Sequence, residues 1–179
     1  MRARIVPMMM SVLLATSAAR ADDAAATFHD LLVQYRCPVV DRLERIYETG
    51  DPSSSRDRYL AITVPHVAQA YVQCMFHDNN RKLYCEAASG FYYDPPGAPR
   101  TFHQPANAIA ALGRLGFSTD DSAGNFSIDL DVAAAPDFNA LADFMLKALH
   151  DGYGARADMK LQFNAPFAPR TSSKCIPVS

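Results

Sequence analysis

Four cysteines are the residues of this chain whose chemistry is easiest to interpret, and they are Cys37, Cys74, Cys85 and Cys175. An even number of cysteines in an exported protein argues for disulfides, and four cysteines allow 3 pairings. Thiol redox enzymes typically carry a Cys-x-x-Cys motif, and this chain has none. We therefore expect structural disulfides and no catalytic thiol.

Other candidate chemical sites are weak. The histidines include no pair at i,i+4 spacing and no acidic partner at ligand spacing, so no metal site is predicted; they are His29, His66, His77, His103 and His150. No Gly-x-Ser-x-Gly nucleophile turn and no phosphate-binding glycine loop occurs. The sequence thus predicts no catalytic residue, no metal and no cofactor.

The loop Asp120-Asp-Ser-Ala-Gly-Asn resembles a calcium-binding loop in composition alone. With Gly124 as its sixth residue, Ala123 and Leu130 would occupy positions that an EF-hand loop gives to oxygen ligands. We therefore expect a capped turn here.

The first residues resemble a secretory signal peptide. Arg2 and Arg4 precede an apolar run, and Ala19-Arg-Ala is a small-x-small cleavage signal before Asp22. We expect residues 1–21 to be removed and the protein to be periplasmic or secreted; the alternative is an uncleaved signal anchor. No later stretch approaches the roughly 20 apolar residues of a membrane span. The net charge of -2 gives no basic footprint for nucleic acid.

The segment from Ala70 to Gly90 predicts the hairpin that positions two of the cysteines. If Asn79 and Asn80 form a two-residue turn, Cys74 pairs with Cys85, which leaves Cys37 for Cys175. We expect the cross-strand pair at a hydrogen-bonded site, with Cα atoms about 5.5 Å apart. Alternation places six side chains on one dry face, namely Val72, Cys74, Phe76, Leu83, Cys85 and Ala87. The other face is mixed.

The rest of the chain supplies the elements around this hairpin. A helix is expected before Cys37, a kink or break at Pro38, and a second helix up to Gly50. Alternation predicts strands over 59–64 and 126–132, and three-and-four spacing predicts helices over 105–115 and from Pro136 to Gly152 or Gly154. Residues 159–163 could add a short strand or form a packed arm. The fold class is thus α+β, with an antiparallel sheet of about four to five strands and helices on one face, in the order helix-βββ-helix-β-helix. We expect a single domain over 22–165 and a C-terminal tail over 166–179.

Two motifs, together with this element order, resemble the type III secretion chaperone-like domains, including the TY-Chap type. They are Leu115-Gly-Phe before a strand that begins Asn125-Phe, and a helix from Phe138 that ends in Tyr153-Gly. The resemblance covers residues 24–163. It implies a peptide- or protein-binding chaperone without catalysis, often a homodimer.

Aromatic residues supply the best candidate for a binding surface, because tyrosine presents contact area and a polar tip at low entropic cost. They are Tyr71, Tyr84, Phe91, Tyr92 and Tyr93, with Phe102 close by. A partner peptide could lie on the open sheet face or extend an edge strand. We therefore expect an exported, non-enzymatic peptide- or protein-binding domain. The alternatives are a small secreted hydrolase or metal-dependent enzyme, recognised by a cleft with a His beside a carboxylate, and an inhibitor or immunity-type protein with an acidic patch.

Overall fold

The computed structural model describes residues 15–175, with side chains from Thr27 onward. The first fourteen residues of the predicted signal peptide lie outside the described residues, as do the side chains of its remaining residues. The backbone from residue 15 belongs to the first helix, α1 (Ala15–Glu48).

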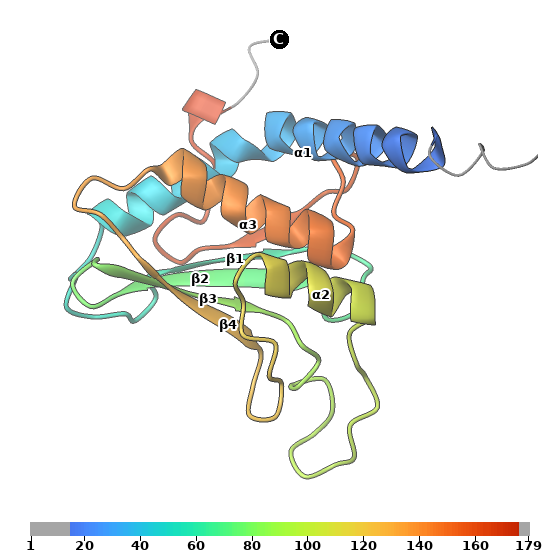
Figure 1. The fold of residues 1–179 in the computed structure, drawn as a ribbon. Coiled ribbons are helices and arrows are strands. Elements are labelled where there is room, and N and C mark those ends of the chain that lie inside the picture. Colours follow the sequence, from blue (N-terminus) through green and yellow to red (C-terminus); the bar gives the residue numbers. More distant parts are fainter. Residues whose placement is uncertain (1–14, 176–179) are drawn as a thin grey trace, which may run out of the picture.

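One antiparallel sheet and three α-helices form the fold (Figure 1). The elements after α1 are β1 (Tyr59–Thr63), β2 (Tyr71–His77), β3 (Lys82–Ala87), α2 (Ala106–Arg114), β4 (Phe126–Asp131), α3 (Phe138–Tyr153), β5 (Gln162–Asn164) and a 3-10 turn, η1 (Ser173–Cys175). The strand order across the sheet is β4-β3-β2-β1-β5. Figure 1 shows α1, α2 and α3 on the same side of the sheet. The predicted α+β class, element order and one-sided helix layer are confirmed, and residues 162–164 form the fifth strand.

The β2–β3 hairpin has the predicted register, with Cys74 opposite Cys85. Val72, Cys74 and Phe76 are at most 1% exposed, while the residues between them are half-buried. The same alternation holds in β1 and β3. Over β1, β2 and β3, one face of the sheet is therefore fully buried and the other is not.

The prediction that Cys74 and Cys85 occupy a hydrogen-bonded pair of positions is wrong. Phe76 N donates to Arg58 O on one side of β2, and Ala88 N donates to Tyr71 O on the other. Because peptide groups alternate sides along a strand, Cys74 directs its N–H and C=O toward β1 rather than toward Cys85. The pair is non-hydrogen-bonded, and its Cα atoms are only 4.1 Å apart.

The reason lies in the turn. Asp78 adopts a left-handed conformation (φ 50°) together with Asn79 (φ 56°) and Asn80 (φ 66°). Because Asp78 is a third left-handed residue, the peptide groups of β2 point to the opposite sides from those that a two-residue turn would give. The residues that face each other, such as Cys74 and Cys85, stay the same. Asn and Asp tolerate this region better than most residues.

A buried arginine ties the hairpin turn to the end of α1. Arg58 is 1% exposed, and its guanidinium donates to Thr49 O at 2.9 Å, to Tyr47 O at 3.3 Å and to Asn80 Oδ1. Asn80 Nδ2 in turn donates to Tyr47 O at 3.1 Å. The last carbonyl groups of a helix lack helical partners, and here side-chain donors satisfy two of them.

Helix α1 passes through Pro38 without a break, so of the predicted kink or break the separation into two helices is wrong and a bend within one helix is what the structure shows. Proline removes one backbone N–H and crowds the carbonyl of Gln34, which bends helices. In Figure 1 the ribbon of α1 changes direction between its blue and cyan parts. Packing explains the continuity, because Leu31, Val39 and Leu43 on both sides of the proline are fully buried.

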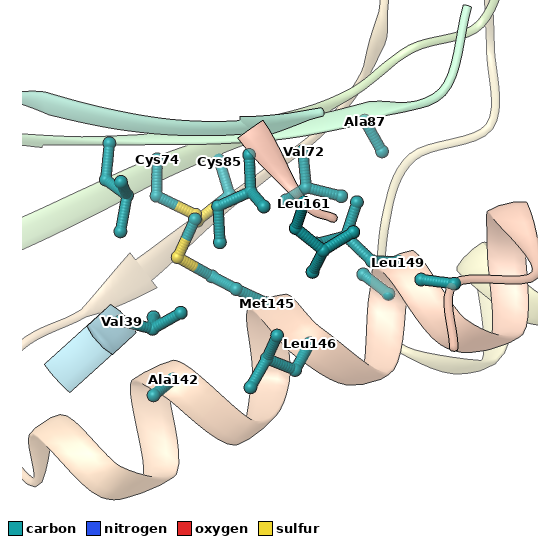
Figure 2. Packing of buried hydrophobic residues seen from close by; sticks show 14 of the residues in the cluster. Val39, Val72, Cys74, Cys85, Ala87, Ala142, Met145, Leu146, Leu149 and Leu161 are labelled. Carbon is teal, nitrogen blue, oxygen red and sulfur yellow. A yellow bond between two sulfur atoms is a disulfide. The ribbon is translucent and has the colours of Figure 1, made fainter. Parts of the chain in front are cut away.

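The core lies between the sheet and the helices α1 and α3 (Figure 2). The disulfide between Cys74 and Cys85 is inside it, with both residues at most 1% exposed. Figure 2 shows Met145 of α3 directed toward this disulfide. Asp137 caps the start of α3, because its carboxylate accepts from Ala140 N at 3.0 Å, and left-handed Gly154 caps the end of the helix.

The segment after β5 packs back on α1. Ala165 and Ala168 are buried, and Ser172 N donates to Asp41 Oδ2 at 3.2 Å. A second disulfide joins Cys37 of α1 to Cys175 of η1. Burial alone would raise the pKa of Asp41, but hydrogen bonds from Ser172 and the neighbouring Arg45 hold it below its ordinary value.

Met145→Ala tests the packing under the hairpin disulfide. Met145 is fully buried, so we expect the variant to lose about 2–5 kcal/mol of unfolding free energy through lost contacts and a residual cavity. Urea titration followed by circular dichroism measures it. Met159→Ala, at a half-buried methionine, is the control and should lose clearly less. Equal losses in the two variants would contradict this packing.

Candidate binding surface

The side of the sheet opposite the helices has no helix over it (Figure 1), and we call it the open face. Its side chains occupy the alternating positions that are not buried: Tyr59, Ala61 and Thr63 of β1, Tyr71, Gln73, Met75 and His77 of β2, Lys82, Tyr84 and Glu86 of β3, Ser127, Asp129 and Asp131 of β4, and Gln162 and Asn164 of β5.

An apolar row crosses the middle of the open face. Tyr59 lies opposite Met75 in the β1–β2 ladder, and Met75 lies opposite Tyr84 in the β2–β3 ladder. Facing residues on adjacent strands have Cβ atoms about 5 Å apart, so three large side chains lie next to one another. All three are half-buried although no helix covers them.

Tyr71 stands at the end of the open face near the long loop that follows β3. Its hydroxyl accepts a hydrogen bond from Asn125 Nδ2 at 2.7 Å, and Asn125 Oδ1 accepts one from Ser89 N at 3.2 Å. Burial raises the pKa of the Tyr71 phenol, and the nearby Glu86 and Tyr92 add to this shift. The phenol is therefore held neutral and in a fixed orientation.

The loop over residues 88–104 carries the other predicted aromatic side chains. Phe91 and Tyr92 meet edge to face with ring centroids 4.9 Å apart, and the Arg100 guanidinium lies 5.7 Å from the Phe91 ring centroid. Arg100 also pairs with Asp121 at 2.8 Å. Tyr93 packs on Phe102, with centroids 5.1 Å apart. Tyr92 is 62% exposed and Tyr93 is 50% exposed.

Gly90 fixes the start of this loop. Its φ of +91° suits glycine, and a Cβ there would lie 2.5 Å from the Phe102 ring. Asp94 closes the loop further along, because its carboxylate accepts from Thr101 N at 2.6 Å and from Thr101 Oγ1 at 2.7 Å. The aromatic side chains are thus presented by an ordered loop.

The structure places the five predicted residues in three groups. Tyr71, Phe91 and Tyr92 lie together where the loop meets the sheet. Tyr84 belongs to the apolar row, and Tyr93 forms a separate pair with Phe102. Sequence reasoning missed Tyr59 and Met75 as members of the surface. Alternation along the hairpin puts Met75 on the same face as Tyr84, so the signal is present in the sequence pattern.

A charged cluster ends the open face on the β4 side. Asp129 Oδ1 lies 2.9 Å from His77 Nε2, and Lys82 Nζ lies 3.6 Å from Asp129 and 3.0 Å from Asp131. The hydrogen bond with His77 and the charge of Lys82 lower the pKa of Asp129. These pairs are solvent-exposed and each contributes little to stability.

The acidic residues of the loop over 120–125, before β4, are used in a turn and in hydrogen bonds to neighbouring segments. Ser122 N donates to Asp120 Oδ1 at 3.0 Å, Asp121 holds Arg100, and Asn125 joins Ser89 to Tyr71. Within residues 15–175, no three His, Cys, Asp or Glu side chains are grouped so that they could hold a metal ion.

One cleft does bring a histidine beside a carboxylate. His150 Nδ1 lies 2.7 Å from Asp151 Oδ1, and His150 Nε2 lies 3.2 Å from Thr27 Oγ1. A hollow of about 460 Å³, lined by His150, Asp151 and His103 among others, opens beside them. Burial would raise the pKa of Asp151, but hydrogen bonds from Lys147 and His150 lower it. Lys147 shares the carboxylate at 2.8 Å, so Asp151 is not dedicated to His150.

Of the comparisons with known proteins, one gives a match. No curated protein and no solved structure matches the chain. In the described part of the chain, no helix has the length and apolar character needed to cross a membrane. The profile of one protein family matches residues 39–167, which include every strand, helices α2 and α3, and the end of α1. The chain therefore belongs to the TY-Chap3 family, described as T3SS (YopN, CesT) and YbjN peptide-binding chaperone 3.

Proposed function

We propose that this protein is an exported, non-enzymatic peptide-binding domain that holds an unfolded segment of a partner protein on its open face. The observation that carries the proposal is the row Tyr59, Met75 and Tyr84, which crosses three strands and has no helix over it. A methionine between two tyrosines offers an adaptable apolar contact flanked by rigid ones. Such a surface suits segments with apolar or aromatic side chains.

The edges of the sheet are less suited to a peptide than its face. Ser118 already pairs with Ser127 at the β4 edge, through bonds of 2.7 and 3.2 Å. The rest of that edge carries Asp129 and Asp131, and charged side chains discourage strand addition. At the other edge, β5 has only three residues. We therefore place the peptide across the open face, with Tyr71 and Tyr92 bordering one end.

We also propose that the chain is exported, to the periplasm or outside the cell. The predicted signal peptide, residues 1–21, supports this proposal, and so do the two disulfides, because disulfides persist in oxidising compartments. In this account residues 22–165 form a single domain. Residues 166–179 are a C-terminal tail that the disulfide at Cys175 ties to α1.

The same face could also join two copies of the chain into a homodimer, an arrangement that would compete with peptide binding. Tyrosine and methionine are common at both kinds of interface. Size-exclusion chromatography with and without peptide distinguishes peptide binding from dimerisation through this face. We expect the peptide to bind to a monomer, or to a dimer whose interface leaves the open face free.

A secreted hydrolase is the second candidate, and Thr27, His150 and Asp151 are the observation in its favour. A hydroxyl, an imidazole and a carboxylate in hydrogen-bonded sequence are the parts of a nucleophilic triad. However, Thr27 is not among the residues that line the neighbouring hollow, and Lys147 shares the carboxylate. Phe28 also packs on the His150 ring, with centroids 5.4 Å apart. These contacts favour a structural link between α1 and α3.

Met75→Glu tests the open face. A carboxylate in the apolar row should weaken binding of an unfolded protein about tenfold or more, because it removes a central contact and adds a charge to be desolvated. The probe is fluorescent carboxymethylated α-lactalbumin, and anisotropy gives its Kd. Val33→Glu is the matched control, since Val33 is 74% exposed on α1, and it should bind like the wild type. Equal weakening in both variants, or no binding by the wild type, would refute the proposal.

Export is checked by the mass of the protein. The full-length chain, expressed in a secretion-competent bacterium, should give an intact mass that begins at Asp22. Non-reducing peptide mapping should recover Cys74 joined to Cys85 and Cys37 joined to Cys175. A mass that still includes Met1, with free thiols throughout, would speak against export.

His150→Gln separates the structural role from the enzymatic one. We expect unchanged hydrolysis of p-nitrophenyl acetate, and a loss of about 1 kcal/mol of unfolding free energy from the broken link between α1 and α3. Thr27→Ala should behave in the same way. If both variants instead abolish an ester hydrolysis that the wild type shows above buffer, the hydrolase is the correct assignment.

A further inference from the structure

The two disulfides lie in opposite surroundings. Cys74 and Cys85 are at most 1% exposed and are enclosed by the core (Figure 2). Cys37 is an exposed residue of α1, and its partner Cys175 is half-buried in η1. A thiol in solution can reach only the second pair without opening the fold, because exchange requires direct attack on a disulfide sulfur.

A hollow of about 340 Å³ lies beside the exposed disulfide. Both cysteines line it, together with Val33, Tyr35, Pro38 and Phe163. Val33 precedes Cys37 by four residues on α1, so the two side chains are neighbours on one helix face. Its 74% exposure makes it the most exposed large apolar side chain recorded for the described residues. The disulfide thus has an apolar rim on which a partner could rest.

We propose that Cys37–Cys175 is a site of thiol–disulfide exchange, at which a dithiol reductant occupies this hollow and attacks Cys37 Sγ. A new S–S bond forms between the attacking sulfur and Cys37, and the bond to Cys175 breaks. Cys175 leaves as a thiolate and takes up a proton. The second thiol of the reductant then attacks its own mixed disulfide and releases Cys37. Two electrons pass from the dithiol, which becomes a disulfide, to the pair of cysteines.

Exchange at this site would act on the C-terminal segment alone. With the disulfide open, the segment beyond Ala168 is still hydrogen-bonded to α1, through Ser172 N with Asp41 at 3.2 Å and Arg45 with Arg170 O. The sheet retains Cys74–Cys85 inside the core. The inference does not rest on peptide binding, since the hollow is formed by α1, Phe163 and the C-terminal segment rather than by the open face.

The test is reduction of the full protein by dithiothreitol under native conditions, with timed alkylation and peptide mapping. Cys37 and Cys175 should become alkylated at least about ten times faster than Cys74 and Cys85, which react only when the core opens. Hydrogen exchange should then rise in residues 169–175 and stay unchanged in the β2–β3 hairpin. Loss of both disulfides at one rate, or earlier loss of Cys74–Cys85, would overturn the proposal.

Substitutions at Val33 test the site itself. The attacking species is an anionic thiolate, so Val33→Lys should speed reduction of Cys37–Cys175 and Val33→Glu should slow it, each by about two- to fivefold at low salt. Val67→Lys and Val67→Glu are the matched controls, because Val67 is 41% exposed and does not line this hollow. They should leave the rate unchanged. Equal effects at the two positions, or none at Val33, would contradict attack from the hollow.

Discussion

The register of the β2–β3 hairpin is the constraint on which the rest of the structure depends. Because side chains alternate along a strand, a shift by one residue would exchange the buried and open faces of the whole hairpin. The left-handed turn at Asp78, Asn79 and Asn80 sets that register, and Arg58 ties Asn80 to the end of α1. The Cys74–Cys85 disulfide then holds the facing residues together inside the core. The position of every other strand follows from this pair.

The open face exists because the helices cover only one side of the sheet. All three α-helices pack on the face that carries Cys74 and Cys85, so the opposite residues of each strand are left without a covering element (Figure 1). Polar side chains occupy most positions of the open face, whereas Tyr59, Met75 and Tyr84 form a continuous apolar row across it. The chain belongs to a family of peptide-binding chaperones, and we propose this uncovered apolar row as the place for the peptide, with the ordered loop at Tyr92 as its limit at one end.

Much of the fold could be predicted because local patterns and tertiary packing agree. The alternation of Leu60, Ile62 and Val64, and the Asn79-Asn80 turn, identify strands and register directly. Continuity of α1 through Pro38 could not be predicted, because buried contacts on both sides outweigh a local penalty. The third left-handed residue, Asp78, has no sequence signal that separates it from a strand end. Likewise, the approach of Tyr92 to Tyr71 depends on a long loop closed by Asp94 and Gly90, which local patterns do not describe.

The most direct test of the central claim is site-specific photocrosslinking to an unfolded peptide probe. A photoreactive phenylalanine analogue is placed at Met75 on the open face or, in a second protein, at Val33 on α1. The account predicts that carboxymethylated α-lactalbumin is captured from position 75 and not from position 33. Capture from α1 with none from the sheet would show that the peptide lies on the helix side, and the open face would then have to be abandoned as the binding surface.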